Sequence, residues 1–254
     1  MRPIGIGAAL LGVVGAMHAG GAGAQGAATL RTTPVPASAR QLVLVVTAGW
    51  DSTAGVLRRF RRDGAGGPWL AEGSAVPVVV GRAGLGWAGD SLGATGDPRK
   101  REGDGRAPAG VLPLDEAFGF APKSAMAWAQ LPYVQLTEGS ECVDDTASAH
   151  YNTIVDRARI ASIDWSSSER MREIGQYAVG VVVGYNSRPA VPGRGSCIFL
   201  HIWGGPGSST AGCTAMPRPA VESLLLWLDP RRRPVMVQLP AVEYARLRRS
   251  WQLP

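Results

Sequence analysis

Glycine and proline interrupt this chain so often that few stretches could form a long helix. The 254 residues include 34 Gly and 19 Pro, and both residue types break helices and mark turns. Short apolar runs between them favour a mainly β fold, a sandwich or barrel, with a few short helices. Strands are predicted at 41–48, 75–81, 111–114, 132–136, 176–184, 197–203 and 234–239, and helices at 123–130, 166–174, 220–228 and 241–251. The run 52–62 suits either a short helix or a strand.

The first residues resemble a targeting segment rather than part of the fold. Arg2 precedes an apolar stretch at 4–17, and Ala22-Gly23-Ala24 forms a small-residue cleavage site. This pattern predicts a signal peptide over 1–24, with an uncleaved anchor as the alternative. We expect a flexible lead-in over 25–40, then one domain over 41–254, long enough to bury a full core. The mature protein is expected outside the cytoplasm.

The chain is mildly basic. Its formal net charge is +6, and removing the leader with Arg2 leaves +5. This surplus suits an anionic partner such as a cell-wall polymer, a membrane surface or nucleic acid, but it equally serves solubility alone. The arginine clusters lack interleaved aromatic residues, so we expect solvated faces and no nucleic-acid binding. They lie at 58–59, 61–62, 231–233 and 248–249.

Three cysteines allow one disulfide and one free thiol. If Cys142 pairs with Cys197, then Cys213 stays free. The alternative is that Cys142 and Cys197 are two buried thiols acting as small apolar residues. Without paired short spacings, the three cysteines do not predict a zinc site.

The segment 195–216 has the parts of a cysteine-nucleophile site. An apolar run ends on His201, a glycine-rich loop follows, and Cys213 comes next. A thiol needs a base to become a nucleophilic thiolate, and imidazole is the usual one. The chain has two further histidines, His18 in the leader and His150. The alternative is a structural histidine and an inert buried thiol.

A second polar cluster holds Asp144, Asp145, His150 and Asn152. Its composition is metal-like, but its spacing is not that of a metal site. We therefore predict no metal and no cofactor, and expect these residues to contact substrate or to order a loop.

The catalytic segment resembles that of the YkuD-domain L,D-transpeptidases. His201, the glycine-rich loop and Thr210-Ala211-Gly212-Cys213-Thr214-Ala215-Met216 match the family pattern of His followed by Ser/Thr-x-Gly-Cys. The resemblance covers about 75–240 and is closest to a compact proteobacterial branch. Its other pieces are Val79-Val80-Gly81-Arg82, the segment 100–110, Cys142-Val143-Asp144-Asp145 and Tyr151-Asn152. Two positions depart from the family pattern, Ala211 and Ala215, where many members have His or Lys and Arg respectively.

This resemblance implies a YkuD-type catalytic domain in a periplasmic peptidoglycan enzyme. Cys213 would be the nucleophile and His201 its base, with an oxyanion held by backbone N–H groups around Gly212 and Cys213. Thr210 would orient the loop or touch substrate, or only cap the backbone. Trp203 would line the donor groove or simply pack under the loop. The remaining expected substrate-binding residues are Arg82, Asp145, Tyr151 and Asn152.

The implied partners are donor and acceptor stem peptides. The thioester on Cys213 would be resolved by the amine of an acceptor diaminopimelate, giving a 3,3 or a 1,3 cross-link. An L,D-carboxypeptidase or endopeptidase would share every motif and use water instead. The alanines at 211 and 215 also allow an inactive peptidoglycan-binding protein. A secreted metal-binding protein using Asp144, Asp145 and His150 is the third class of function.

Overall fold

The computed structural model describes Met1 and residues 34–89 and 97–254. From residue 34 onward, the described residues belong to a single compact unit. The predicted signal peptide after Met1, and residues 25–33 of the predicted lead-in, lie outside the described residues. Within those described ranges, no helix has the length and apolar character needed to cross a membrane.

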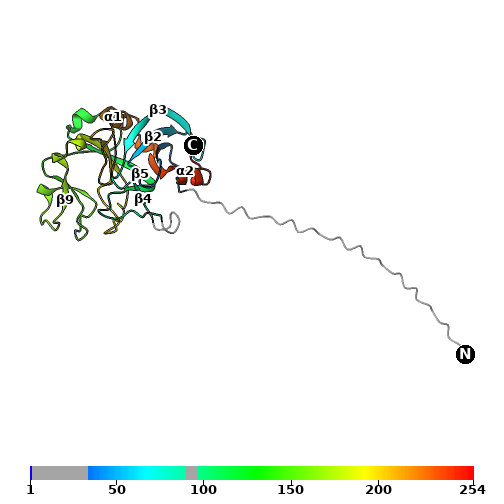
Figure 1. Cartoon of the computed structure of the whole chain (residues 1–254), viewed down its shortest axis with the longest axis horizontal. Coiled ribbons are helices and arrows are strands. Elements are labelled where there is room, and N and C mark those ends of the chain that lie inside the picture. The colour runs from blue at the N-terminus through cyan, green and yellow to red at the C-terminus, as the bar shows by residue number, and fades with distance from the viewer. Residues whose placement is uncertain (2–33, 90–96) are drawn as a thin grey trace. The chain divides into compact units, whose positions relative to one another are not determined.

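Eight strands close into a barrel (Figure 1). They are β1 (Gln41–Thr47), β2 (Ala54–Arg61), β3 (Leu70–Val79), β5 (Ala107–Gly119), β10 (Val179–Val183), β11 (Phe199–Ile202), β12 (Thr214–Met216) and β13 (Val235–Pro240). The order runs β10-β11-β12-β3-β2-β1-β13-β5, and β5 pairs back to β10. The short strands β4 (Leu85–Trp87) and β6 (Tyr133–Gln135) extend the sheet from β5. The predicted mainly β, barrel-like fold with few helices is confirmed.

Residues 42–46 of β1 are all apolar because both faces of the strand are buried. Leu42 and Leu44 pack into one buried cluster, whereas Val43 and Val45 pack into another. Successive side chains of a strand point to opposite faces, so a strand buried on both faces has no polar positions to alternate. Its parallel neighbour β13 is buried along its whole length for the same reason.

Two short α-helices complete the domain. Helix α1 (Arg218–Trp227) buries Val221, Leu224 and Leu225 in the cluster that also holds Val43 and Val45, as its helical spacing predicts. Helix α2 (Ala241–Leu247) packs against β13 and β1 and is shorter than predicted. The run 52–62 is a strand, β2.

The domain begins before residue 41, which corrects the predicted lead-in. Val35 and Ala39 are buried in the core. Arg62, expected on a solvated face, is buried and holds this segment by donating to the carbonyl oxygens of Ala39 at 2.5 Å and Pro36 at 2.7 Å. Its guanidinium also lies 4.2 Å from the ring centroid of Trp69. Buried carbonyls need donors, so this arginine is structural.

A small three-stranded sheet projects from the barrel, and we call residues 140–170 the lobe. Its order is β8 (Ile154–Asp156), β7 (Ser140–Val143), β9 (Ser168–Arg170). Figure 1 shows β9 on the opposite side of the barrel from α2. Of the one or two helical turns predicted over 166–174, the 3-10 turn Met171–Glu173 is present, and the residues before it form β9. A disulfide between Cys142 of β7 and Cys197 ties the lobe to the barrel.

Candidate active site

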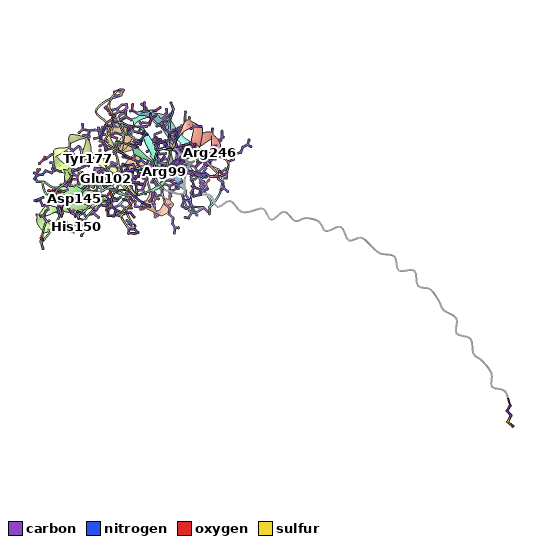
Figure 2. The ribbon with its side chains drawn as sticks, turned by 60° about the horizontal axis from the view of Figure 1, so that its bottom comes forward. Arg99, Glu102, Asp145, His150, Tyr177 and Arg246 are labelled. Carbon is purple, nitrogen blue, oxygen red and sulfur yellow. A yellow bond between two sulfur atoms is a disulfide. The ribbon has the colours of Figure 1, made fainter. Side chains whose placement is uncertain are left out.

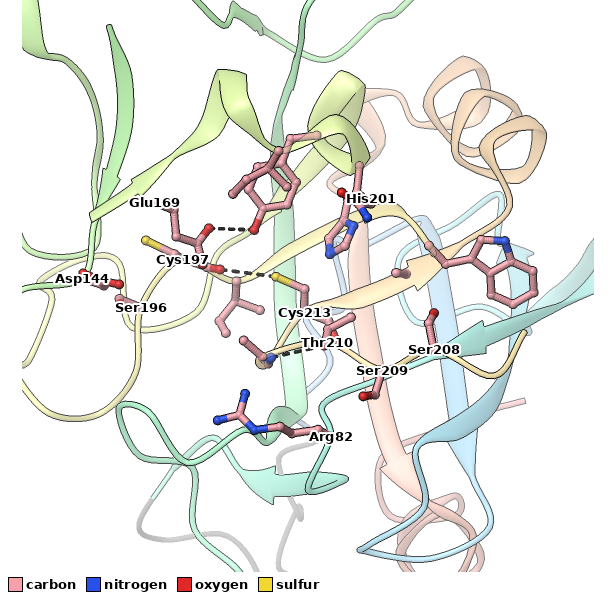
Figure 3. Close-up of a pocket in the computed structure, with 18 of the residues that line it drawn as sticks. Arg82, Asp144, Glu169, Ser196, Cys197, His201, Ser208, Ser209, Thr210 and Cys213 are labelled. Atoms are coloured by element: carbon pink, nitrogen blue, oxygen red, sulfur yellow. Dashed lines mark hydrogen bonds between the residues drawn. The ribbon is translucent and has the colours of Figure 1, made fainter. Parts of the chain in front are cut away.

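Cys213 and His201 are brought together by two neighbouring parallel strands. β11 pairs with β12 so that His201 lies opposite Ala215, and Cys213 immediately precedes β12. Side chains two residues apart share a face of a strand, so Cys213 faces the same side as His201. Both line one cavity of about 420 Å³ (Figure 3).

The turn before Cys213 is held by the Thr210 hydroxyl. Thr210 Oγ1 accepts a hydrogen bond from the N–H of Gly212 at 3.2 Å and donates to the carbonyl of Cys213 at 2.7 Å. Of the two roles expected for Thr210, the backbone cap is therefore present. Gly212 is needed because a Cβ there would lie 3.0 Å from the carbonyl oxygen of Arg106.

The Cys213 thiol is buried and uncharged at rest. Its Sγ accepts from the N–H of Phe199 at 3.3 Å and donates to the carbonyl of Cys197 at 3.4 Å. Burial, reinforced by the charge of Glu169, raises the pKa of Cys213 to about 12. A low dielectric disfavours the thiolate, so this site needs a base that acts during the reaction.

His201 is placed as such a base. Its Nδ1 lies 2.8 Å from the carbonyl oxygen of Ile202. A carbonyl only accepts, so Nδ1 carries the proton and Nε2 keeps a free lone pair. Burial lowers the pKa of His201 to about 4, so the imidazole is neutral at physiological pH. The edge of the Tyr177 ring packs against it, with centroids 5.1 Å apart.

The predicted contacts Tyr151 and Asn152 lie behind the cavity rather than on its surface. Asn152 Oδ1 accepts from the N–H of Cys197 at 2.9 Å, and the Tyr151 hydroxyl accepts from the N–H of Gly195 at 3.1 Å. Both residues therefore position the loop that carries Cys197, which has a left-handed backbone (φ 53°). This ordering matters because the Cys197 carbonyl accepts a hydrogen bond from the Cys213 thiol.

The other predicted substrate residues divide into two groups. Trp203 and Arg82 line the cavity. Arg82 is brought there by a backbone bridge, in which its N–H donates to the Thr210 carbonyl at 2.8 Å. Asp145 accepts instead from the N–H and hydroxyl of Ser166 in the lobe, both at 2.7 Å. Figure 2 shows Asp145 on the side of the molecule opposite Arg246 of α2.

His150 does not compete with His201. It packs against Trp165 of the lobe, with ring centroids 5.5 Å apart, and it does not line the cavity. Among the residues that the structure describes, no three His, Cys, Asp or Glu side chains gather as a metal site would require.

Sequence reasoning found only part of the acidic side of the cavity. Glu102, Asp144 and Glu169 line it, and we call these three carboxylates the acidic wall. Asp144 belongs to the predicted polar cluster, and Figure 3 labels it beside Glu169. The Tyr177 hydroxyl donates to Glu169 Oε2 at 2.6 Å. Glu102 falls in a segment that the family resemblance had marked, but Glu169 and Tyr177 lie in a polar stretch without periodicity. The pairing of Cys142 with Glu169 across β7 and β9 is what brings Glu169 to the cavity.

Comparison with known proteins adds no relative: no family model, curated protein or solved structure matches this chain.

Proposed function

We propose that this protein is a periplasmic cysteine acyltransferase that cross-links peptidoglycan stem peptides, an L,D-transpeptidase of the YkuD type. The observation that carries the proposal is the pairing of a buried thiol with a neutral imidazole on adjacent strands of one cavity. The motif resemblance supplies the substrate class. Covalent storage of the acyl group removes any need for an energy cofactor.

The first half-reaction needs only groups in this cavity. His201 Nε2 takes the proton from the Cys213 thiol as the sulfur attacks a donor carbonyl that follows an L-residue of the stem. The carbonyl oxygen gains the negative charge, and the backbone N–H of Cys213 is the donor we assign to it, because that of Gly212 already binds Thr210. Such a donor contributes about 3 kcal/mol of transition-state stabilisation. The oxyanion then collapses, the departing amine takes the proton from His201, and a thioester remains.

Ala215 cannot supply the positive charge that an arginine at its position would give. Arg82 can offer the donor a cationic contact instead. Its guanidinium forms no ion pair within the described residues, although it lines the cavity. A terminal stem-peptide carboxylate is its natural partner, since guanidinium and carboxylate form charge-assisted hydrogen bonds. Arg82, at the cavity surface, would therefore bind the carboxylate end of a donor peptide.

The second half-reaction returns the acyl group to an amine. The acceptor nitrogen attacks the thioester, its proton passes to His201, and the Cys213 sulfur leaves and is reprotonated. The new amide joins two stems.

Incubating the purified protein with disaccharide tetrapeptide tests the proposal. Cross-linked dimers with loss of the terminal residue are expected, and their linkage distinguishes 3,3 from 1,3. Trimmed monomers without dimers would identify a carboxypeptidase instead. Unchanged substrate would indicate an inactive binding protein.

A further inference from the structure

The acidic wall carries negative charge that no basic residue balances. Glu102, Asp144 and Glu169 are all partly buried beside the nucleophile. Across the described ranges 34–89 and 97–254, none of the three forms an ion pair with Lys, Arg or His. Lys100, which also lines the cavity, is already held by Asp104 at 2.7 Å.

Buried carboxylates elsewhere in this protein form ion pairs with arginine. Glu141 binds Arg157 at 3.2 Å, Asp229 binds Arg231 at 2.8 Å, and Glu243 binds Arg246. Arginine is plentiful in the chain, so a shortage of basic residues does not explain why the acidic wall has no ion pair among the described residues. An unbalanced carboxylate near an apolar interior is costly, and a cation from outside would relieve that cost.

Glu169 is the member of the wall whose charge raises the pKa of the Cys213 thiol. Its Oε2 accepts a hydrogen bond from the Tyr177 hydroxyl at 2.6 Å, and both residues line the cavity that holds Cys213. The Glu169 carboxylate therefore lies in the same cavity as the proposed nucleophile. Burial, together with the charges of Asp144 and Glu102, raises the pKa of Glu169 to about 7. A carboxylate with that pKa takes and releases a proton readily at neutral pH.

We propose that Glu169 binds the ammonium group of the acceptor and removes its first proton, with Asp144 and Glu102 adding attraction for the cation. The inference rests on the proposed function, because it assigns the acceptor side of that same cavity. Ser208 lies on the other side of Cys213 in Figure 3. Ser208 and Trp203, which also lines the cavity, are left for the donor.

The proton balance explains why a second base is needed. An amine arrives as R–NH₃⁺ and cannot attack until it loses one proton. Glu169 takes that proton and becomes a neutral acid. The resulting R–NH₂ attacks the thioester and loses a second proton to His201 Nε2, which passes it to the leaving Cys213 sulfur. Glu169 then returns its proton to water. Hydrolysis of the thioester does not require an ammonium group to lose a proton. Glu169 therefore favours transfer to an amine over hydrolysis.

The test separates acceptors that need deprotonation from those that do not. The full-length mature protein is acylated with disaccharide tetrapeptide, then offered either a diaminopimelate-ended tripeptide or hydroxylamine, which is uncharged at neutral pH. Glu169→Gln should lower the ratio of transfer to hydrolysis with the tripeptide by about 10²-fold, the lower end of general-base effects. With hydroxylamine the ratio should change less than about twofold. The thioester should accumulate, because its consumption slows.

Matched variants guard against a folding artefact. Glu173→Gln removes an exposed carboxylate next to the lobe, paired only with Arg170 at 3.3 Å, and should behave as wild type. Glu169→Asp keeps a carboxylate and should recover part of the transfer. Equal transfer by wild type and Glu169→Gln, with thioester present in both, would overturn this inference alone. No thioester in the wild type would overturn the proposed function as well.

Discussion

The two sides of the cavity differ in how their ionisable groups are held. On the barrel side, Cys213 and His201 are both neutral, because burial moves the pKa of each toward its uncharged form. On the lobe side, the acidic wall gathers charge that the fold does not balance. A barrel strand positions groups by its regular backbone, whereas the lobe positions Glu169 through a disulfide and a few polar contacts. In the proposed function, the barrel side performs the bond chemistry and the acidic wall on the lobe side binds a cation.

The same contrast holds between two glutamates within the lobe. Glu141 points away from the cavity and accepts hydrogen bonds from Trp165 at 2.7 Å and Ser168 at 2.8 Å. Burial alone would raise the pKa of Glu141, but these bonds and Arg157 outweigh it and lower that pKa. Glu169, one strand away, has a raised pKa. Glu141 is held by hydrogen bonds and an ion pair within the fold, whereas Glu169 is the carboxylate that we propose binds a ligand.

The largest expected effect falls on the barrel side. His201→Asn should slow thioester formation by about 10²- to 10⁴-fold, because the buried thiol then has no base. In the wild type, burial lowers the pKa of His201 to about 4, so thioester formation should persist at pH 5.5 and disappear as the pH falls through about 4. Rapid-quench kinetics against pH would measure this. An acid limb near 6.5, the ordinary imidazole value, would contradict the account.

The second prediction concerns how much the disulfide between the lobe and the barrel stabilises the fold. Cys142 and Cys197 are 55 residues apart in sequence. Closing a loop of that size stabilises a fold by about 4 kcal/mol. The double variant Cys142→Ala, Cys197→Ala should therefore lose about that much free energy of unfolding in urea titration. Treating the wild type with reductant should lower its stability similarly. If neither change moves the unfolding midpoint, the lobe does not depend on its covalent tie.

The third prediction compares how replacing each of the two glutamates changes the free energy of unfolding. Glu141→Gln should lower the free energy of unfolding at pH 7.5 by about 1–3 kcal/mol, since it breaks bonds to a charged group. Glu169→Gln should raise it by up to about 3 kcal/mol, because a buried unbalanced charge is removed.

The effects of these two substitutions on the free energy of unfolding depend on pH in opposite directions. The Glu169 pKa is raised in the folded state, so the stability given by its protonated form is present below about 4.5 and lost as the pH rises through about 7. The gain from Glu169→Gln should therefore vanish at pH 4. The Glu141 pKa is lowered, so its contribution is present above about 4.5 and fades as the pH falls. Thermal melts of both variants across this range would show whether the signs differ.

The smallest effect concerns the donor carboxylate. Arg82→Ala should raise the KM for donor tetrapeptide about 10-fold with a smaller change in kcat, because a partly exposed charge pair contributes to binding more than to chemistry. Arg82→Lys should recover part of the loss. Arg101→Ala removes an exposed neighbouring arginine and serves as the control. An unchanged KM in Arg82→Ala would remove Arg82 from the donor site.

The barrel strands were largely predictable because their burial leaves a direct mark on the sequence. The run at 41–48 is apolar throughout since β1 faces two cores, and Val221, Leu224 and Leu225 carry the spacing of α1. The proximity of Cys213 and His201 was also predictable, because a cysteine nucleophile would need an imidazole base close by.

The acidic wall was predictable only in part, because Asp144 belongs to a marked polar cluster whereas nothing local marks Glu169. Glu169 becomes a cavity residue only through its pairing with Cys142 and the disulfide that pins β7. Arg62 likewise looks like a surface residue in sequence, and only the carbonyls of Ala39 and Pro36 make it structural. Long-range contacts decide both positions.

The most direct test of the central claim is the intact mass of the protein, quenched after brief incubation with disaccharide tetrapeptide. The account predicts one added mass, equal to the donor minus its departing residue, on the wild type and none on Cys213→Ala, which should melt near the wild-type temperature. Peptide mapping should place the adduct on Cys213. No adduct on the wild type, or the same adduct on Cys213→Ala, would contradict the claim that this thiol is the nucleophile.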